Sequence, residues 1–155
     1  METMQKLINY LKLNNKTIST CESFTGGMFA NEITNISGAS EVFVGSFISY
    51  QNSFKQNIVG VDERIIKKYG VVSEECAIEM AQKTLKQTRT DFTISFTGNA
   101  GPNALEEKEI GLAYICICSK NAYKTVKINT TKLTRIEFKK NGLKEALNLF
   151  FDFVN

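Results

Sequence analysis

Residues 17–27 read TISTCESFTGG, a short segment of small and β-branched side chains followed by a serine–threonine turn and two glycines. Residues 17–21 predict a strand, and a helix is expected to follow from about residue 26 to residue 34. Such a turn places Ser23 at the carboxyl end of a strand. Ligands of open α/β sheets bind beyond those ends, so this stretch predicts both the fold class and a candidate site.

The remaining sequence alternates strand and helix patterns in the same way. Met4, Leu7, Ile8 and Leu11 have helical spacing, and Ser73 and Thr134 are good residues to begin later helices. Thr134 and Glu137 form a capping-box pattern; we expect an apolar stripe of Ile136, Leu143, Ala146, Leu147, Phe150 and Phe151 on the last helix. Further strands are expected over residues 43–50 (buried on both faces), 92–97, 110–118 and 122–129. The pattern predicts one α/β domain over residues 1–155 with a mostly parallel sheet.

Composition excludes several classes of protein. The chain has 155 residues, 19 Lys and Arg against 16 Asp and Glu, a net charge of +3, and no histidine. A Ser-His-Asp triad, a Cys-His pair and a His-ligated zinc site are therefore excluded. We expect neither metal nor cofactor. The small net charge disfavours a role that depends on neutralising nucleic acid.

The cellular environment is also an expectation from sequence. No apolar run approaches the roughly 20 residues of a membrane span, and the N-terminus shows no hydrophobic signal core. We expect a soluble, cytoplasmic protein without a membrane partner. The four cysteines show no C-x-x-C spacing, which favours reduced thiols acting as small apolar side chains.

Three segments that each follow a predicted strand carry the candidate chemistry. They are residues 22–27, 51–55 and 98–102, and they should converge at one edge of the sheet. Ser23 is a candidate nucleophile, although Ser23 or Thr25 capping a helix is the ordinary explanation of this pattern. Gly26 and Gly27 would let backbone N–H groups approach an anion or a developing oxyanion.

Lys55 is the candidate base. A lysine in this position is usually a solvated surface charge, but burial beside Phe54 would lower its pKa and favour the neutral amine. In a chain without histidine, a neutral lysine is the most plausible group to activate a serine. Tyr50 would position that proton path or bind substrate, or would simply pack.

The third segment and the basic C-terminal region leave alternatives open. Residues 97–102 offer small side chains and backbone donors that suit a ligand, or a tight connection. Residues 120–145 carry eight Lys and Arg against two Glu, normally a solvated face, in which Arg135 at a helix start would suit a phosphate.

Several ordered motifs resemble the CinA C-terminal domain family. Residues 21–27, CESFTGG, resemble its A-E-S-C-T-G-G signature, and residues 50–55, YQNSFK, resemble its Y-S-N-x-x-K segment. Residues 37–40, 70–73, 97–102 and 107–111 resemble its P-G-S-S, G-A-V-S, T-G-I-A-G-P and E-K-P-V-G blocks. The likeness extends over about residues 4–153.

The resemblance implies a stand-alone nicotinamide-nucleotide amidase, which converts nicotinamide mononucleotide to nicotinate mononucleotide and ammonia. It implies a three-layer α/β/α fold with a mixed sheet, and a homo-oligomer, a dimer. Ser23 would be the nucleophile, Lys55 its base and Tyr50 a third catalytic residue. Residues implied to bind the nucleotide substrate are Thr25, Gly26, Gly27, Asn52, Thr97, Gly98, Ala100, Gly101 and Arg135.

The sequence departs from the family pattern near the expected cavity. Asn103, Ala104 and Leu105 replace the usual glycines, Glu109 replaces a proline, and Phe24 replaces a small residue beside the nucleophile. These changes motivate an alternative from another class, a catalytically inactive nucleotide-binding or interaction domain with the same fold. A nucleic-acid accessory protein is a further, less favoured alternative.

Overall fold

A five-stranded sheet forms the centre of the computed structural model, which describes residues 2–103 and 106–155. The strands lie in the order β2-β1-β3-β4-β5. β1 pairs in parallel with β2 and β3, whereas β4 is antiparallel to both β3 and β5. Four of the five strands therefore run in one direction and β4 opposes them. The strands are β1 (Ile18–Glu22), β2 (Phe43–Ile48), β3 (Phe92–Asn99), β4 (Leu112–Cys118) and β5 (Tyr123–Asn129).

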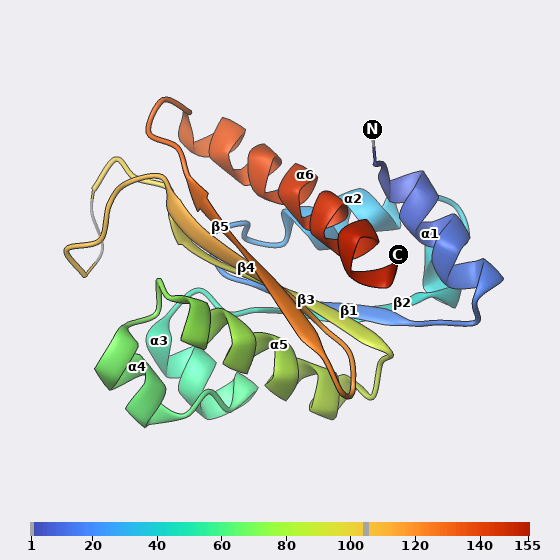
Figure 1. Cartoon of the computed structure of the whole chain (residues 1–155), viewed down its shortest axis with the longest axis horizontal. Coiled ribbons are helices and arrows are strands. Elements are labelled where there is room, and N and C mark those ends of the chain that lie inside the picture. The colour runs from blue at the N-terminus through green and yellow to red at the C-terminus, as the bar shows by residue number, and fades with distance from the viewer. Residues whose placement is uncertain (1, 104–105) are drawn as a thin grey trace.

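Helices cover both faces of this sheet (Figure 1). One face carries α1 (Met4–Leu13), α2 (Met28–Thr34) and α6 (Arg135–Val154), and the other carries α3 (Asn52–Phe54), α4 (Glu63–Tyr69) and α5 (Glu74–Thr88). A 3₁₀ turn (Ala39–Glu41) precedes β2, and a π-helical turn (Lys55–Val59) follows α3. The expected α/β class, mixed sheet and three-layer arrangement are confirmed.

The apolar core lies in two parts, one on each side of the sheet. The larger part packs α1, α2 and α6 against it, and Tyr10 of α1 meets Phe150 of α6 edge to face with ring centroids 5.4 Å apart. The smaller part joins α5 and the preceding segment to β1 and β4. All four cysteines are buried free thiols within or beside this smaller part, as expected.

Local sequence signals set the helix starts. The Ser73 hydroxyl accepts a hydrogen bond from Cys76 N, and Thr134 with Glu137 forms the expected capping box. These caps satisfy N–H groups that a helix leaves without partners at its first turn. The expected starts of α5 and α6 are confirmed.

Two expectations about burial are wrong. β2 was expected to be buried on both faces, but it is an edge strand in which Val44 and Ile48 are 56% and 50% exposed. Ile136 was expected on the core-facing stripe of the last helix but is 61% exposed, because the buried residues of α6 begin only at Phe138. The helices between residues 52 and 69 were not anticipated.

Gly111 holds a tight junction between β3, β4 and the segment after β5. Its N–H donates to Asn99 O at 2.7 Å, and its carbonyl accepts from Thr130 N at 3.0 Å. With φ of +84°, a Cβ at this position would lie 1.6 Å from Thr130 O. Gly60 has a similar φ of +94°, but no atom lies within 4 Å of its Cβ position.

We therefore expect Gly111→Ala to destabilise the protein far more than Gly60→Ala. Gly60→Ala introduces backbone strain alone, about 1–2 kcal/mol, whereas Gly111→Ala must also displace backbone and should lower the free energy of unfolding by at least about 3 kcal/mol. Urea unfolding of both variants measures the difference. Equal losses would contradict the crowding inferred at Thr130.

Candidate active site at the carboxyl ends of β1, β2 and β3

The turn after β1 places Ser23 at the edge of the sheet. Ser23 N donates to Phe96 O of the neighbouring β3 at 2.9 Å, so the backbone at this residue is fixed from the side. The turn then closes through Gly26 N and Ser23 O at 3.0 Å. Gly26 and Gly27 have φ values of +59° and +96°, a conformation that glycine adopts without strain. Ser23 is therefore held by backbone geometry, as expected for a strand-to-helix turn.

Lys55 meets Ser23 across the gap between two strand ends. Its Nζ lies 3.0 Å from Ser23 Oγ and donates to Tyr50 O at 3.4 Å. The residue begins the π-helical turn after α3, and its carbonyl accepts from both Gly60 N and Val61 N. This fixed backbone directs a lysine side chain inward, where it is 1% exposed.

Burial changes the chemistry of Lys55. Desolvation disfavours the ammonium form and lowers the Lys55 pKa below its ordinary value, while Cys76, Cys21 and Glu106 act in the opposite direction. Burial raises the pKa of Cys76 to about 12, so this thiol carries no charge at neutral pH. The lowered pKa makes the neutral amine, the form that can accept a proton from a serine hydroxyl, easier to reach than for a solvated lysine.

A cavity of about 550 Å³ opens above this pair. Segments that follow β1, β2 and β3 all contribute to its wall, which confirms the expected convergence of three distant parts of the sequence. Its lining contains nine of the predicted site residues: Ser23, Tyr50, Asn52, Lys55, Thr97, Gly98, Ala100, Gly101 and Arg135.

Three predicted binding residues, Thr25, Gly26 and Gly27, lie outside the lining of this cavity. The Thr25 side chain is fully buried, and its Oγ1 has no hydrogen-bond partner among the residues that the structure describes. Gly26 faces Lys139 of α6, Gly27 faces Ile48, and the Gly26 N–H is already used inside the turn. The positive φ values carry the chain away from the cavity and into α2, so these glycines shape the turn.

Arg135 and Tyr50 form one rim of the cavity. The Arg135 guanidinium donates from Nη2 to Tyr50 Oη at 2.7 Å and from Nη1 to Gly101 O at 2.6 Å. It thereby links the start of α6 to the segments after β2 and β3. Both acceptors are neutral, and the remaining N–H groups of the guanidinium are available to an anion.

Two carboxylates that sequence reasoning gave no role are tied to this region. Glu22, directly before Ser23, is fully buried and accepts from Phe29 N and Ala30 N of α2, both at 3.0 Å. Glu106 lines the cavity and accepts from Val71 N and Val72 N. Glu22 belongs to the CESFTGG motif, but no sequence pattern near it indicates that the first turn of α2 binds its carboxylate. No local sequence pattern marks Glu106 either. Ala104 and Leu105, where the sequence departs from the family, lie outside the described residues.

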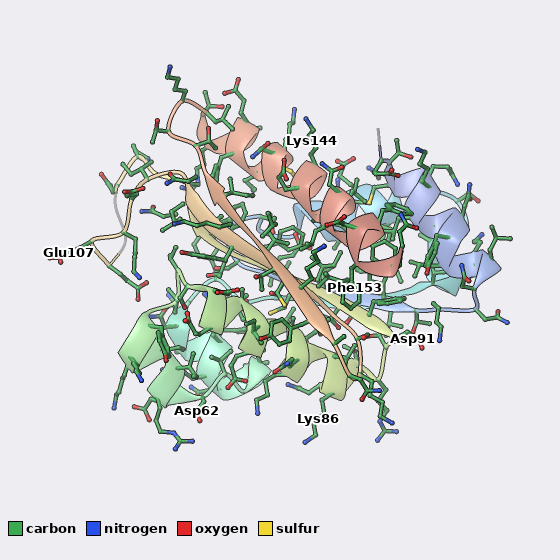
Figure 2. The ribbon with its side chains drawn as sticks, in the orientation of Figure 1. Asp62, Lys86, Asp91, Glu107, Lys144 and Phe153 are labelled. Atoms are coloured by element: carbon green, nitrogen blue, oxygen red, sulfur yellow. The ribbon has the colours of Figure 1, made fainter. Side chains whose placement is uncertain are left out.

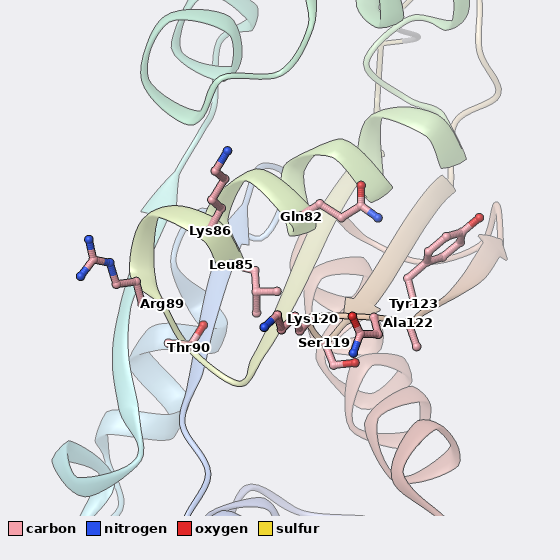
Figure 3. A pocket seen from close by; sticks show the side chains of 10 residues that line it. Gln82, Leu85, Lys86, Arg89, Thr90, Ser119, Lys120, Ala122 and Tyr123 are labelled. Atoms are coloured by element: carbon pink, nitrogen blue, oxygen red, sulfur yellow. The ribbon is translucent and has the colours of Figure 1, made fainter.

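A second cavity, of about 570 Å³, lies at the opposite end of the sheet between α5 and the β4–β5 turn (Figure 3). It shares no lining residue with the first cavity and contains none of the predicted site residues. Lys86, Arg89 and Lys120 contribute its charges, without a nucleophile–base pair. The candidate chemistry therefore belongs to the cavity at Ser23.

Two other features are absent from the part of the chain that the structure describes. Residues 2–103 and 106–155 contain no group of three or more Cys, Asp or Glu side chains arranged to hold a metal ion. Within the same ranges, no helix has the length and apolar character needed to span a membrane.

The fold and cavity together define an α/β/α domain with a ligand-sized site at the carboxyl ends of parallel strands. The family model described as the CinA C-terminal domain matches residues 1–154, and the chain belongs to this family. The resemblance inferred from the motifs is confirmed.

Individual relatives agree with this assignment. A CinA-like protein of Pseudothermotoga lettingae is 42% identical over 118 residues, covering 76% of this chain and 29% of the relative. A CinA-like protein of Prochlorococcus marinus subsp. pastoris is 40% identical over 147 residues, 93% of this chain and 34% of the relative. The chain thus spans about a third of the length of these curated relatives. The crystal structure of competence/damage inducible protein CihA from Agrobacterium tumefaciens superposes with a TM-score of 0.93 and 28% identity, covering 98% of this chain and 93% of that one.

We expect Glu22→Gln to destabilise the fold, because an amide replaces one of two acceptor oxygens facing N–H donors. The expected loss is about 1–3 kcal/mol in the free energy of unfolding, measured by urea denaturation. Glu32→Gln, at an exposed position of α2, the helix whose first turn donates to Glu22, is the matched control and should be close to neutral. Equal effects of the two substitutions would contradict the structural role of Glu22.

We expect Lys55→Met to be more stable than the wild type at pH 7. Unfolded lysine keeps its proton up to about pH 10.4, whereas burial lowers the pKa of folded Lys55. The unfolded state therefore binds more protons between the two pKa values, and wild-type stability rises with pH across that window. Methionine does not titrate, so its advantage should shrink as pH approaches 10.

Thermal unfolding between pH 6 and pH 10 measures this difference. Lys67→Met, at an exposed residue that pairs with Glu63, is the control and should show little of the same pH dependence. A Lys55→Met variant whose stability relative to wild type is unaffected by pH would contradict the lowered pKa.

Proposed function

We propose that the chain is a serine amidohydrolase that converts nicotinamide mononucleotide to nicotinate mononucleotide and ammonia. The observation that carries the proposal is the 3.0 Å approach of Lys55 Nζ to Ser23 Oγ in a cavity wall, with the amine almost fully buried. A buried amine beside a hydroxyl supplies a base for nucleophilic attack in a chain without imidazole. Membership of the CinA C-terminal domain family supports the same assignment.

The proposed reaction needs only the serine, the lysine and water. Neutral Lys55 takes the proton from Ser23 Oγ as the oxygen attacks the carboxamide carbon, giving a tetrahedral intermediate. The protonated lysine then transfers that proton to the departing nitrogen, and ammonia leaves as the acyl-enzyme forms. Water, deprotonated by Lys55, attacks the ester, and the proton returns to Ser23 Oγ as the carboxylic acid is released.

The cavity dimensions and charges are compatible with a nucleotide. Its volume of about 550 Å³ lies in the usual range for small-molecule sites. Arg135 stands at the rim with neutral partners, so a substrate phosphate would gain a charge-assisted hydrogen bond by displacing Tyr50 Oη or Gly101 O. We therefore assign Arg135 to the phosphate.

The decisive experiment measures ammonia released from nicotinamide mononucleotide. Ser23→Ala and Lys55→Ala should each lower kcat at least about 100-fold, because nucleophile and base act as one unit. Ser53→Ala and Lys67→Ala change exposed residues outside this cavity and should retain wild-type activity.

Two outcomes would overturn the proposal. Full activity of either Ser23→Ala or Lys55→Ala removes the mechanism. Calorimetric binding of the nucleotide by the wild type, with no ammonia produced over hours, would instead identify the inactive nucleotide-binding alternative.

A further inference from the structure

Glu106 sits in a cradle of backbone groups on the cavity wall. Both oxygens of its carboxylate lie 3.0 Å from Val71 N, and Oε1 also accepts from Val72 N at 3.1 Å. Gly70 completes the cradle. A Cβ on Gly70 would lie 2.8 Å from each carboxylate oxygen, so the space that the carboxylate occupies exists because this residue has no side chain.

The cradle is held in shape by groups other than Glu106. Thr97 Oγ1 donates to Val71 O at 2.5 Å, and Ser73 Oγ donates to Gly70 O at 2.8 Å. Val71 and Val72 are both buried and belong to the core beneath the cavity. Two N–H groups therefore remain aimed at the same point whether or not Glu106 is present.

Glu106 itself is an exposed residue on the segment between β3 and β4. That segment has other attachments, because Asn99 Nδ2 donates to Lys108 O at 3.2 Å and Lys108 Nζ donates to Tyr69 O at 3.3 Å. The Glu106 side chain can leave the cradle while its backbone stays anchored. It is also the one acidic residue in the cavity lining as described, so it occupies the place that an external carboxylate would take.

We propose that the backbone amides of Val71 and Val72, with Gly70, form a carboxylate-binding subsite of the cavity, which Glu106 fills in the free protein. A ligand carboxylate enters by displacing the Glu106 side chain. If the amidase assignment holds, the subsite binds the carboxylate of the product acid, and Glu106 competes with the product and promotes its release.

The experiment titrates acetate into ¹⁵N-labelled protein and follows the amide resonances of Val71 and Val72. Glu106→Ala empties the subsite, and acetate should then shift both resonances with half-saturation at a lower concentration than in the wild type, because the attached Glu106 carboxylate competes for the same two amides. Acetamide, which is neutral, should bind more weakly to the same variant.

Glu107→Ala is the matched control. Glu107 has nearly the same backbone conformation, with φ of +59° against +54° for Glu106, and its side chain points away from the body of the molecule in Figure 2. The Glu107→Ala variant should respond to acetate as the wild type does. Adding Gly70→Ala to Glu106→Ala places a methyl group in the cradle and should abolish the response.

Equal acetate responses in the wild type, Glu106→Ala and Glu107→Ala would overturn the proposal, and so would the absence of a saturable shift in Glu106→Ala. Retained binding after Gly70→Ala is added would also overturn it. None of these readouts uses turnover, so the subsite and the amidase activity can fail separately. If ammonia release is found, stronger inhibition of Glu106→Ala than of the wild type by nicotinate mononucleotide supports the product assignment, and equal inhibition rejects it.

Discussion

The contact between Lys55 and Ser23 requires an amine to stay where water cannot solvate it. The cost of this burial is met by the rigid framework around the two residues, since Ser23 N is bonded to β3 and the carbonyl of Lys55 accepts two N–H groups. Neither side chain could hold this position from a mobile loop. The sheet order β2-β1-β3 brings their two segments together, and Thr97 and its neighbours close the third side.

Carboxylates around the site are held by backbone amides instead of by cations. Glu22 binds the first turn of α2 and stabilises the turn that carries Ser23, with no lysine or arginine among its described hydrogen-bond partners. Glu106 uses the same kind of donor but lies at the surface, where water can replace its bonds. The amide-bound carboxylate of Glu22 is therefore a fixed part of the fold, whereas the amide-bound carboxylate of Glu106 can be exchanged for water or a ligand.

Sequence reasoning located the parts of the fold that depend on local signals. The caps at Ser73 and Thr134 and the arrival of three strand-following segments at one edge follow from patterns within a few residues. The position of β2 at the edge of the sheet could not be predicted in this way, because an apolar run such as residues 43–50 has the same pattern in an edge strand as in a central strand. Two further features depend on residues far away in sequence. They are the position of Gly26 and Gly27 outside the cavity lining and the backbone cradle that holds Glu106. The expected dimer stays a prediction.

The four cysteines have a practical consequence of their own. Burial raises the pKa of each thiol, and those of Cys76 and Cys118 reach about 12. The nucleophilic thiolate is therefore scarce while the helices stay packed against the sheet. The rate at which an alkylating reagent modifies these sulfur atoms is therefore set by how often the layers separate. That rate measures how often the domain opens, without any introduced probe.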